Sequence, residues 1–263
     1  MSRCVLITGA ANGIGKELAW KFGNAGYNLQ LFDVDREGLY KFAQKLKNAK
    51  ISVEYFAGDV SDMDDVEGMF WEFEETLPDV VINNAGIGYN GELALMSLED
   101  WEKLIEVNLL GPIYFMCQYL PDMIKRGSGH VVNVSSGQAF FRLPSWGAYA
   151  AIKTALGVIS ELFSFEASKY GIKFTTVYPF MVNTPFYTNV DGDTFVSKLS
   201  MKLLPYYSDS PEKVASKIFN AVQKNKRIEL VNPINLIGVG IRSVPPLANV
   251  ITRMASKLLI KGE

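Results

Sequence analysis

Residues 4–15 read Cys-Val-Leu-Ile-Thr-Gly-Ala-Ala-Asn-Gly-Ile-Gly, an apolar run that passes directly into a glycine-rich turn. The run at residues 4–8 predicts a buried strand, and the amphipathic stretch from Ile14 to Asn24 predicts a helix. Glycines between a strand and a helix let the backbone approach a pyrophosphate, whose charge is attracted to the helix N-terminus. The spacing fits the usual dinucleotide fingerprint only loosely, so a glycine-rich connection without a ligand stays open as the alternative.

The rest of the chain alternates short strands with longer amphipathic helices, as in βα units that feed a parallel sheet. Seven strands are expected, at Cys4–Thr8, Asn28–Phe32, Ser52–Ala57, Val80–Asn83, His130–Val134, Lys173–Tyr178 and Arg227–Val231. Helices are expected at Ile14–Asn24, Arg36–Lys47, Met63–Thr76, Leu98–Lys125, Gly147–Lys169 and Pro211–Lys224. We therefore predict an α/β fold with a single doubly wound, Rossmann-type domain and a seven-stranded parallel sheet flanked by helices.

Serines in front of three of these helices predict where the helices begin. Ser61, Ser97 and Ser210 can each accept hydrogen bonds from free N–H groups of the first helical turn. Pro211 suits a first helical position, where its missing N–H has no cost.

Composition narrows the class of partner. The chain has 263 residues and a formal net charge of −2, without a long basic run, which argues against nucleic acid and favours a small molecule. Cys4 and Cys117 are the only cysteines, so we expect no disulfide framework and a reducing, cytoplasmic location. His130 is the only histidine, which disfavours a Ser-His-Asp triad and a zinc site, and no metal is predicted.

Neither end of the chain predicts a membrane span. The apolar run after Arg3 is too short for a secretory signal and leads into the glycine turn. The apolar stretch 234–251 is interrupted by Arg242 and by Pro245 and Pro246 before it reaches the ~20 residues that a spanning helix needs.

Asp33 follows the predicted second strand, where an acidic residue can bond the adenosine ribose of a dinucleotide. Its carboxylate would repel a 2′-phosphate and therefore favours NAD over NADP. Capping of the next helix is the alternative role, for which Asp35 is better placed. Arg36 lies nearby and can admit a 2′-phosphate, so NADP stays open.

Tyr149 and Lys153 are four residues apart in a predicted helix and therefore project from the same face. A tyrosine pKa of about 10 must fall by ~2 to 3 units for proton transfer near neutral pH, and an adjacent cation in a dry site can supply the required ~3 to 4 kcal/mol. Such a tyrosine can give a proton to a carbonyl or remove one from an alcohol. The pair alone also arises by chance on ordinary amphipathic helices.

Taken together, four groups of residues resemble the short-chain dehydrogenase/reductase family. They are the turn Thr8–Gly15, the sequence Asn-Asn-Ala-Gly at residues 83–86, the strand end Val134–Ser136 and the Tyr149/Lys153 pair. Their order and spacing match the family from the N-terminus to about Thr184. The resemblance implies an oxidoreductase that transfers a hydride between a nicotinamide dinucleotide and an alcohol or ketone.

The resemblance also implies roles for individual residues. Ser136 would bond the substrate oxygen, Tyr149 would act as general acid and base, and Lys153 would hold the nicotinamide ribose and lower the tyrosine pKa. Asn108 matches a helix asparagine that anchors a water in a proton relay. The cofactor-binding residues implied are Gly9, Asn12, Gly13, Ile14, Gly15, Asp33, Asp59, Val60, Asn83, Ala85, Gly86, Tyr149, Lys153, Val182 and Thr184.

One position departs from the family pattern. Pro-Gly usually follows the sixth strand, whereas this chain has Pro179 and Phe180, so we expect a narrowed or redirected loop beside the nicotinamide. Large apolar side chains gather around these segments, at Phe140, Phe141, Trp146, Phe180, Met181, Phe186 and Tyr187. They predict an apolar pocket and a lipophilic substrate, although core or subunit-interface packing is equally compatible with them.

We divide the chain into a catalytic domain, residues 1–231 with a substrate loop at 181–209, and an apolar, basic extension at 232–263. The extension has an apolar stripe, Leu247, Val250 or Ile251, Met254 and Leu258, beside Arg253, Lys257 and Lys261. We expect it to pack on its own domain, with a membrane surface as the less favoured alternative.

The function predicted is an NAD(H)-preferring dehydrogenase/reductase that forms a homotetramer or homodimer. Two alternatives remain, an NADPH-dependent reductase of 3-oxoacyl-type carbonyls and a nucleotide-binding scaffold that has lost turnover. The complete set Ser136, Tyr149, Lys153 and Asn108 argues against the scaffold.

Overall fold

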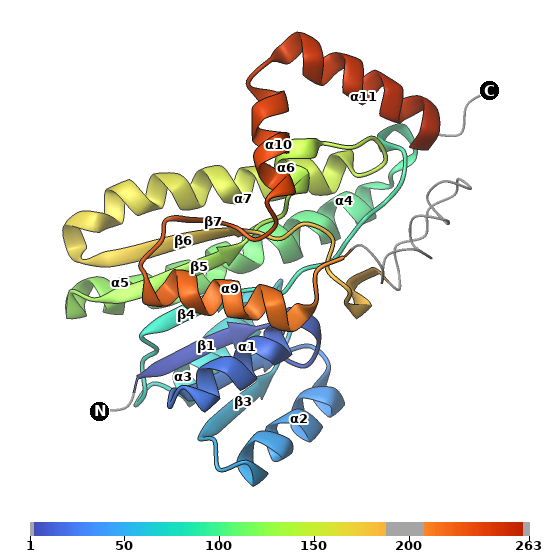
Figure 1. Ribbon diagram of the computed structural model, residues 1–263. Helices are drawn as coiled ribbons and strands as arrows, with labels where there is room; N and C mark the ends of the chain where they lie inside the picture. Colours follow the sequence, from blue (N-terminus) through green and yellow to red (C-terminus); the bar gives the residue numbers. More distant parts are fainter. Residues whose placement is uncertain (1–2, 188–207, 260–263) are drawn as a thin grey trace.

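A seven-stranded parallel sheet forms the centre of the protein (Figure 1). The computed structural model describes residues 3–187 and 208–259. In chain order the strands are β1 (Cys4–Thr8), β2 (Asn28–Asp33), β3 (Val53–Ala57), β4 (Val80–Asn83), β5 (Gly129–Val134), β6 (Ile172–Tyr178) and β7 (Ile228–Leu230). In space they follow the order β3-β2-β1-β4-β5-β6-β7, which confirms the predicted fold class.

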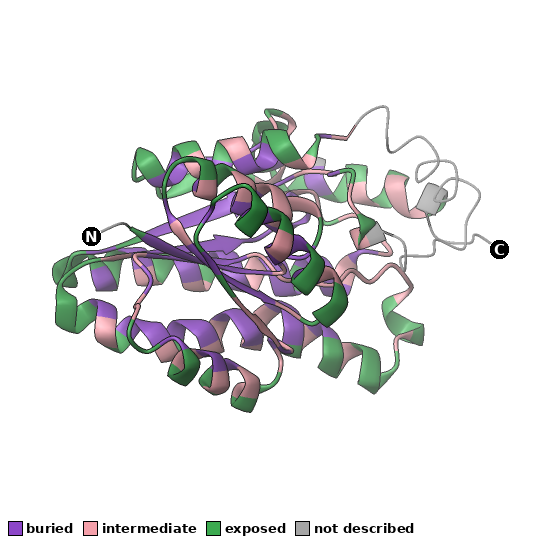
Figure 2. Ribbon diagram, turned by 90° about the horizontal axis from the view of Figure 1, so that it is seen from below, coloured by how far each residue is buried: buried purple, intermediate pink, exposed green. Residues whose placement is uncertain are grey.

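Helices cover both faces of the sheet, which explains why its strands are almost continuously apolar. The helices are α1 (Gly13–Asn24), α2 (Arg36–Asn48), α3 (Met63–Glu72), α4 (Leu98–Ile105), α5 (Gly111–Arg126), α6 (Gln138–Phe141), α7 (Gly147–Glu166), α9 (Pro211–Gln223), α10 (Ile234–Arg242) and α11 (Pro245–Leu259). Side chains of α1, α2 and α9 pack on one face, and those of α3, α5 and α7 on the other. Figure 2 shows the buried strands between these two layers.

The order of the strands creates a crevice at one edge of the sheet. From β1 the chain builds outward through β2 and β3, and then returns to place β4 on the other side of β1. The turns after β1 and β4 therefore leave the sheet in opposite directions. In doubly wound sheets this switch point, at the carboxyl ends of the strands, is where ligands bind.

The structure corrects three local predictions. The predicted helix Leu98–Lys125 is interrupted by a π-helical segment at Glu106–Leu110, between α4 and α5. The helix predicted at Met63–Thr76 ends at Glu72. Its cap is Asp62, which accepts a hydrogen bond from the Asp64 N–H.

Ser61, the expected cap of that helix, instead directs its hydroxyl to Asp59 at 2.6 Å. Ser97 and Ser210 do cap their helices, by accepting bonds from the N–H groups of Asp100 and Lys213.

α7 continues into a short 3₁₀ turn, and the stretch Gly147–Tyr170 is long and apolar enough to cross a membrane by length and composition alone. Half of its most apolar window is buried inside the protein, because α7 packs on β5 and β6. The apolar side chains of this helix therefore serve the core, and we infer no membrane span from them.

The C-terminal extension begins as an integral part of the fold. Asn235 of α10 is fully buried and donates to the Tyr178 carbonyl at 2.7 Å, which fixes α10 over the end of β6. Arg242 at the other end of α10 donates from Nε to the Phe140 carbonyl of α6 at 3.0 Å. α11 packs mainly on α10 and lies at the periphery of the molecule (Figure 1).

The single histidine is a structural residue of the sheet. Thr175 donates its hydroxyl to the Lys226 carbonyl at 2.6 Å, so the hydroxyl oxygen accepts from Nε2 of His130 at 2.7 Å. Burial, followed by the nearby charge of Lys173, lowers the pKa of His130 to about 4. His130 is therefore neutral in the folded protein at neutral pH.

This burial predicts a loss of stability in acid. In the unfolded chain the histidine takes up a proton below a pKa of about 6.5, whereas the folded protein resists protonation down to about pH 4. Its contribution of about 3 kcal/mol is complete above pH 6.5 and disappears as the pH falls to 4. Urea unfolding of wild type and His130→Asn between pH 7 and pH 4 measures it, and parallel pH dependences of the two proteins would contradict the assignment.

Candidate active site

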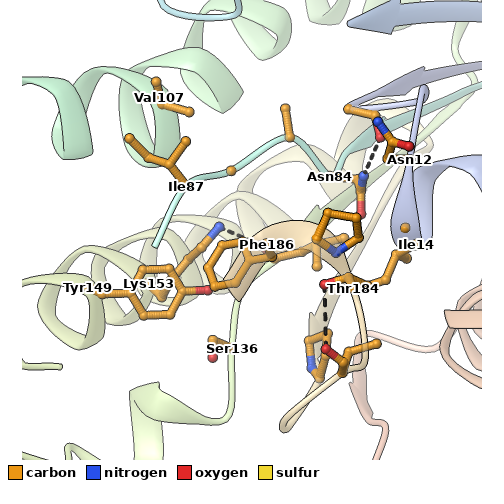
Figure 3. Close-up of a pocket in the computed structure, with 18 of the residues that line it drawn as sticks. Asn12, Ile14, Asn84, Ile87, Val107, Ser136, Tyr149, Lys153, Thr184 and Phe186 are labelled. Carbon is orange, nitrogen blue, oxygen red and sulfur yellow. Dashed lines mark hydrogen bonds between the residues drawn. The ribbon is translucent and has the colours of Figure 1, made fainter. Parts of the chain in front are cut away.

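A cavity of about 510 Å³ lies at the carboxyl end of the sheet, at the predicted switch point (Figure 3). Its walls come from the turns after the first six strands, from α4 and the segment Glu106–Leu110, and from α7. The sequence-predicted residues that line it are Gly9, Asn12, Gly13, Ile14, Asp33, Asp59, Val60, Ala85, Gly86, Ser136, Tyr149, Lys153, Val182 and Thr184. One cavity thus brings together the residues expected for cofactor binding and those expected for catalysis.

The glycine turn owes its shape to missing side chains. Gly9 has φ +65°, and a Cβ there would lie 2.9 Å from the Ala85 Cα. A Cβ on Gly15 would lie 2.0 Å from the Gly9 carbonyl oxygen. Gly15 is therefore a packing residue that lets α1 approach the turn, and it does not line the cavity.

Hydrogen bonds tie the turns after β1 and β4 together. The Thr8 hydroxyl oxygen accepts from the backbone N–H groups of Asn84 and Ala85, each at 3.0 Å. In return, the Asn84 side-chain amide donates to the Thr8 carbonyl at 2.9 Å and the Gly9 carbonyl at 3.2 Å. Asn84 is visible between the two turns in Figure 3, and it lines the cavity.

The structure places Asn84, and not the predicted Asn83, in the cavity wall. Asn83, expected to line the cofactor site, does not line the cavity and is 3% exposed. Its amide donates to Asn133 Oδ1 at 2.7 Å, and Asn133 in turn donates to Ser160. Successive strand residues point to opposite faces, so the side chain that reaches the cavity is that of Asn84.

The first turn of α1 faces the cavity and suits an anion. Asn12 occupies the N-cap position without a side-chain cap bond, and the first turn contains no acidic residue. The free N–H groups and the positive end of the helix dipole favour a phosphate at this place.

Asp33, at the end of β2, has its carboxylate held by the backbone. Oδ2 accepts from the Ala11 N–H at 2.8 Å and Oδ1 from the Asp35 N–H at 2.9 Å. Burial raises the pKa of Asp33, while these N–H bonds oppose that shift. The capping role belongs to Asp35, which accepts from the Gly38 N–H at 3.0 Å, so Asp33 remains directed at the cavity.

Lys153 is a buried cation beneath Tyr149. Its Nζ lies 5.9 Å from the centre of the Tyr149 ring, and the residue is 3% exposed. Nζ donates to the Val134 carbonyl at 3.0 Å, and burial lowers the pKa of Lys153 to about 8. Figure 3 shows Tyr149, Lys153 and Ser136 on the same side of the cavity.

The two serines after β5 have different surroundings. Ser135 is buried and donates to the Lys153 carbonyl at 2.7 Å, so it fixes α7 to the strand. Both serines line the cavity, but the Ser136 Oγ accepts from the Gln138 N–H at 3.2 Å, which leaves its own proton to be donated elsewhere. Ser136 is thus the serine placed to bond a ligand.

Asn108 supports the cavity wall from behind and does not line it. The residue is fully buried in the π-helical segment, where its amide donates to the Ile87 carbonyl at 3.0 Å and its Oδ1 accepts from the Ile87 N–H at 3.3 Å. Pro112 has no N–H to donate to the Asn108 carbonyl four residues earlier, which favours a π-helical turn at this position. π-helical turns often occur at functional sites.

Several lining residues were not foreseen. Asn84, Ile87, Lys103 and Gln138 all line the cavity. Ile87 and Gln138 each lie four residues after the end of a predicted strand, in the loops that lead away from the sheet. Lys103 lies in a helix and gave no signal in the sequence.

The large apolar residues expected around the site divide into two groups. Trp146, Phe180, Met181 and Phe186 line the cavity, and the rings of Trp146 and Phe186 each lie 5.7 Å from the Tyr149 ring. Phe140 and Phe141 lie behind this wall, against Tyr178 and Phe180 respectively. The side chain of Tyr187 and most of the predicted loop 181–209 lie outside the described residues.

Within the described ranges, no group of three or more His, Cys, Asp or Glu side chains is arranged to hold a metal ion. The cavity instead combines an anion-binding helix end, a carboxylate, and a tyrosine above a buried cation.

A model of the short chain dehydrogenase family matches residues 3–194. The chain belongs to the short-chain dehydrogenase family. "Probable oxidoreductase EphD" of Mycobacterium tuberculosis is 32% identical over 257 residues, which are 93% of this chain but only 43% of that protein. "Dehydrogenase/reductase SDR family member 7B" of Xenopus laevis is 32% identical over 252 residues, which cover 92% of this chain and 78% of that protein.

Solved structures agree with this assignment. A short chain dehydrogenase/reductase from Burkholderia phymatum, in complex with NAD, superposes with a TM-score of 0.84 and 25% identity over 92% of this chain and 93% of that one. The family predicted from the four groups of residues is thereby confirmed.

The supporting position of Asn108 yields a prediction. Asn108→Ala removes the hydrogen-bond partner of the half-buried Ile87 backbone and of the buried Leu104 carbonyl, so the free energy of unfolding should fall by about 2 to 4 kcal/mol. Asn220→Ala, at an exposed position of α9, is the matched control and should change it by less than about 0.5 kcal/mol. Denaturant unfolding of both variants checks this, and equal stabilities would show that Asn108 does not support the wall.

Proposed function

We propose that this short-chain dehydrogenase is an NAD(P)-dependent oxidoreductase that interconverts an alcohol and a ketone, with Ser136, Tyr149, Lys153 and Asn108 as its catalytic set. The observation that carries the proposal is the position of Tyr149 above buried Lys153, in the same cavity as the glycine turn. A nicotinamide dinucleotide, when bound, supplies or accepts the hydride. The NAD complex of the related Burkholderia protein supports this class of cofactor.

The residues of the chain then handle the proton. Lys153 carries a positive charge at pH values below about 8, close enough to Tyr149 to favour its phenolate. Tyr149 can therefore take the proton of an alcohol, or donate one to a carbonyl oxygen as it becomes an alkoxide. Ser136 bonds the same oxygen and holds it near the tyrosine. Asn108 positions the wall at Ile87 and anchors a water on the route to solvent.

The surroundings of Asp33 favour NAD. Its half-buried carboxylate lines the cavity, where it can accept a bond from a ribose hydroxyl and would repel a 2′-phosphate. Arg36, which could neutralise such a phosphate, lines a separate hollow with Tyr55 and Glu72. NADPH-dependent reduction of a 3-oxoacyl-type carbonyl is the second candidate, since Lys103 lines the cavity and offers a cation that could bind a 2′-phosphate.

A lipophilic substrate suits the part of the cavity beyond Tyr149. Trp146 and Phe186 flank the tyrosine ring, and Phe180 and Met181 extend the apolar wall. Such a wall stabilises a bound apolar ligand by removing the apolar surface of both from water.

The outer face of α7 supports assembly into a homodimer or homotetramer. Val158, Leu162 and Phe165 lie on one side of this helix and are 50%, 56% and 56% exposed. Apolar side chains at this spacing on a surface helix are typical of a subunit interface. A reducing compartment such as the cytoplasm suits Cys117, an exposed free thiol.

A panel of alcohols and ketones, followed by nicotinamide absorbance with NAD(H) and NADP(H), tests the reaction. We expect turnover of apolar ketones or secondary alcohols, and Tyr149→Phe should lower kcat at least 10³-fold while the fluorescence-measured Kd for the dinucleotide stays within about twofold. Lys153→Met should move the acid limb of the pH profile upward, because the phenolate loses its neighbouring cation. An unimpaired Tyr149→Phe enzyme, or turnover of small charged substrates only, would overturn the proposal.

Asp33 gives a separate prediction for cofactor choice. Asp33→Ala removes the ribose contact and the repulsion of a 2′-phosphate, so the NAD to NADP ratio of kcat/KM should fall by about tenfold or more. Asp35→Ala is the matched control: it removes only a helix cap, and the ratio should stay unchanged. Equal ratios in all three enzymes would show that Asp33 does not select the cofactor.

A further inference from the structure

α10 exposes one apolar face. Its opposite side is packed, since Asn235 is fully buried and a Cβ on Gly238 would lie 3.0 Å from Phe140 and Phe141. On the outer side, Leu236 and Ile237 are 62% and 60% exposed. One side of α10 therefore packs on the domain, and none of the described residues covers its apolar outer side.

α11 also exposes apolar side chains. Val250 and Met254, one helical turn apart, are 57% and 64% exposed, and neighbouring Ile251 is 36% exposed. Ala248, on the other side of the helix, is buried. The sequence led us to expect this stripe to pack on its own domain, whereas the described part of the stripe points outward.

The charge of this region is unlike that of the rest of the chain. From residue 232 to residue 262 there is no Asp or Glu, while Arg242, Arg253, Lys257 and Lys261 are all basic; the whole chain has a formal net charge of −2. On α11, Arg253 and Lys257 are exposed and lie along one edge of the stripe formed by Val250 and Met254. An apolar stripe bordered by cations is the pattern of a helix that lies in a membrane interface.

We propose that α10 and α11 form a docking surface for a membrane that contains anionic phospholipid. The apolar stripe enters the boundary between headgroups and acyl chains, and the stems of Arg253 and Lys257 let their charges reach the headgroups. A second copy of this chain is a poorer occupant, because face-to-face contact would bring two acid-free basic stretches together. The helices lie on the membrane and do not cross it.

The docking surface does not depend on the proposed reaction, but its position would bring the cavity close to the membrane. α10 packs on α6, and Phe141 of α6 lies 5.0 Å from the ring of Phe180 in the cavity wall. Docking through α10 therefore holds the apolar side of the cavity near the lipid. That step, delivery of a lipophilic substrate from the membrane, rests on the proposed function.

Flotation of the full chain with vesicles tests the docking surface without any measurement of turnover. We expect the wild type to float with phosphatidylcholine vesicles that contain about 30% phosphatidylserine, and to bind pure phosphatidylcholine at least tenfold more weakly. Met254→Glu should reduce binding at least tenfold. Trp71→Glu, which changes a residue of similar exposure on α3, should bind as the wild type does.

The contribution of charge is tested separately. Arg253→Gln with Lys257→Gln should weaken binding to anionic vesicles about tenfold or more, and added salt should have the same effect on the wild type. Lys45→Gln with Lys47→Gln, in the last turn of α2, is the matched control and should bind normally. Circular dichroism verifies that every variant is folded.

Two results would overturn the proposal. The first is a wild-type protein that remains at the bottom of the gradient with anionic vesicles; a change of oligomeric mass in Met254→Glu would then assign the face to a second copy. The second is a folded Met254→Glu variant that floats like the wild type. Neither of these results bears on turnover in the substrate panel, so the two proposals fail separately.

Discussion

The contact between the turns that follow β1 and β4 is the constraint on which the rest of the structure depends. Gly9 approaches Ala85 so closely that a Cβ would lie 2.9 Å from its Cα, and the Thr8 hydroxyl bonds the backbone of both Asn84 and Ala85. Because neither strand can shift along the other without breaking these bonds, the turn that leads into α1 and the turn after β4 form one rigid corner. The remaining walls of the cavity are added to this corner by α4, by α7 and by the turns after β2, β3, β5 and β6.

The burial of Lys153 is the least favourable feature of that arrangement. Its Nζ bonds the Val134 carbonyl, and it makes no ion pair with a carboxylate in the part of the chain that the structure describes. Desolvation of the ammonium opposes folding, as the lowered pKa records, so the surrounding core must offset its cost. Lys153 opposes folding, yet it lies beside a tyrosine in a cavity. Function rather than packing therefore explains the choice of a lysine at this position.

The sequence predicted the sheet well because each strand is an apolar run between glycine, proline or polar turns. It predicted the site less completely, for identifiable reasons. Asn83 and Asn84 are adjacent and chemically identical, and only the pleat of β4 decides that Asn84 reaches the cavity. The π-helical segment at Glu106–Leu110 was missed although Pro112 stood within the predicted helix, since a proline can also be tolerated there, as Pro121 is within α5.

Phe180 shows how a departure from the family pattern can be linked to a distant part of the chain. We expected its bulk to redirect the loop beside the cofactor, and its ring does line the cavity, but it also packs against Phe141 of α6. α6 is in turn covered by α10, through Gly238 and through the bond from Arg242 to the Phe140 carbonyl. A glycine at position 180 would leave Phe141 without this partner and loosen the seat of α10. The aromatic residue and the C-terminal extension therefore form one packed unit.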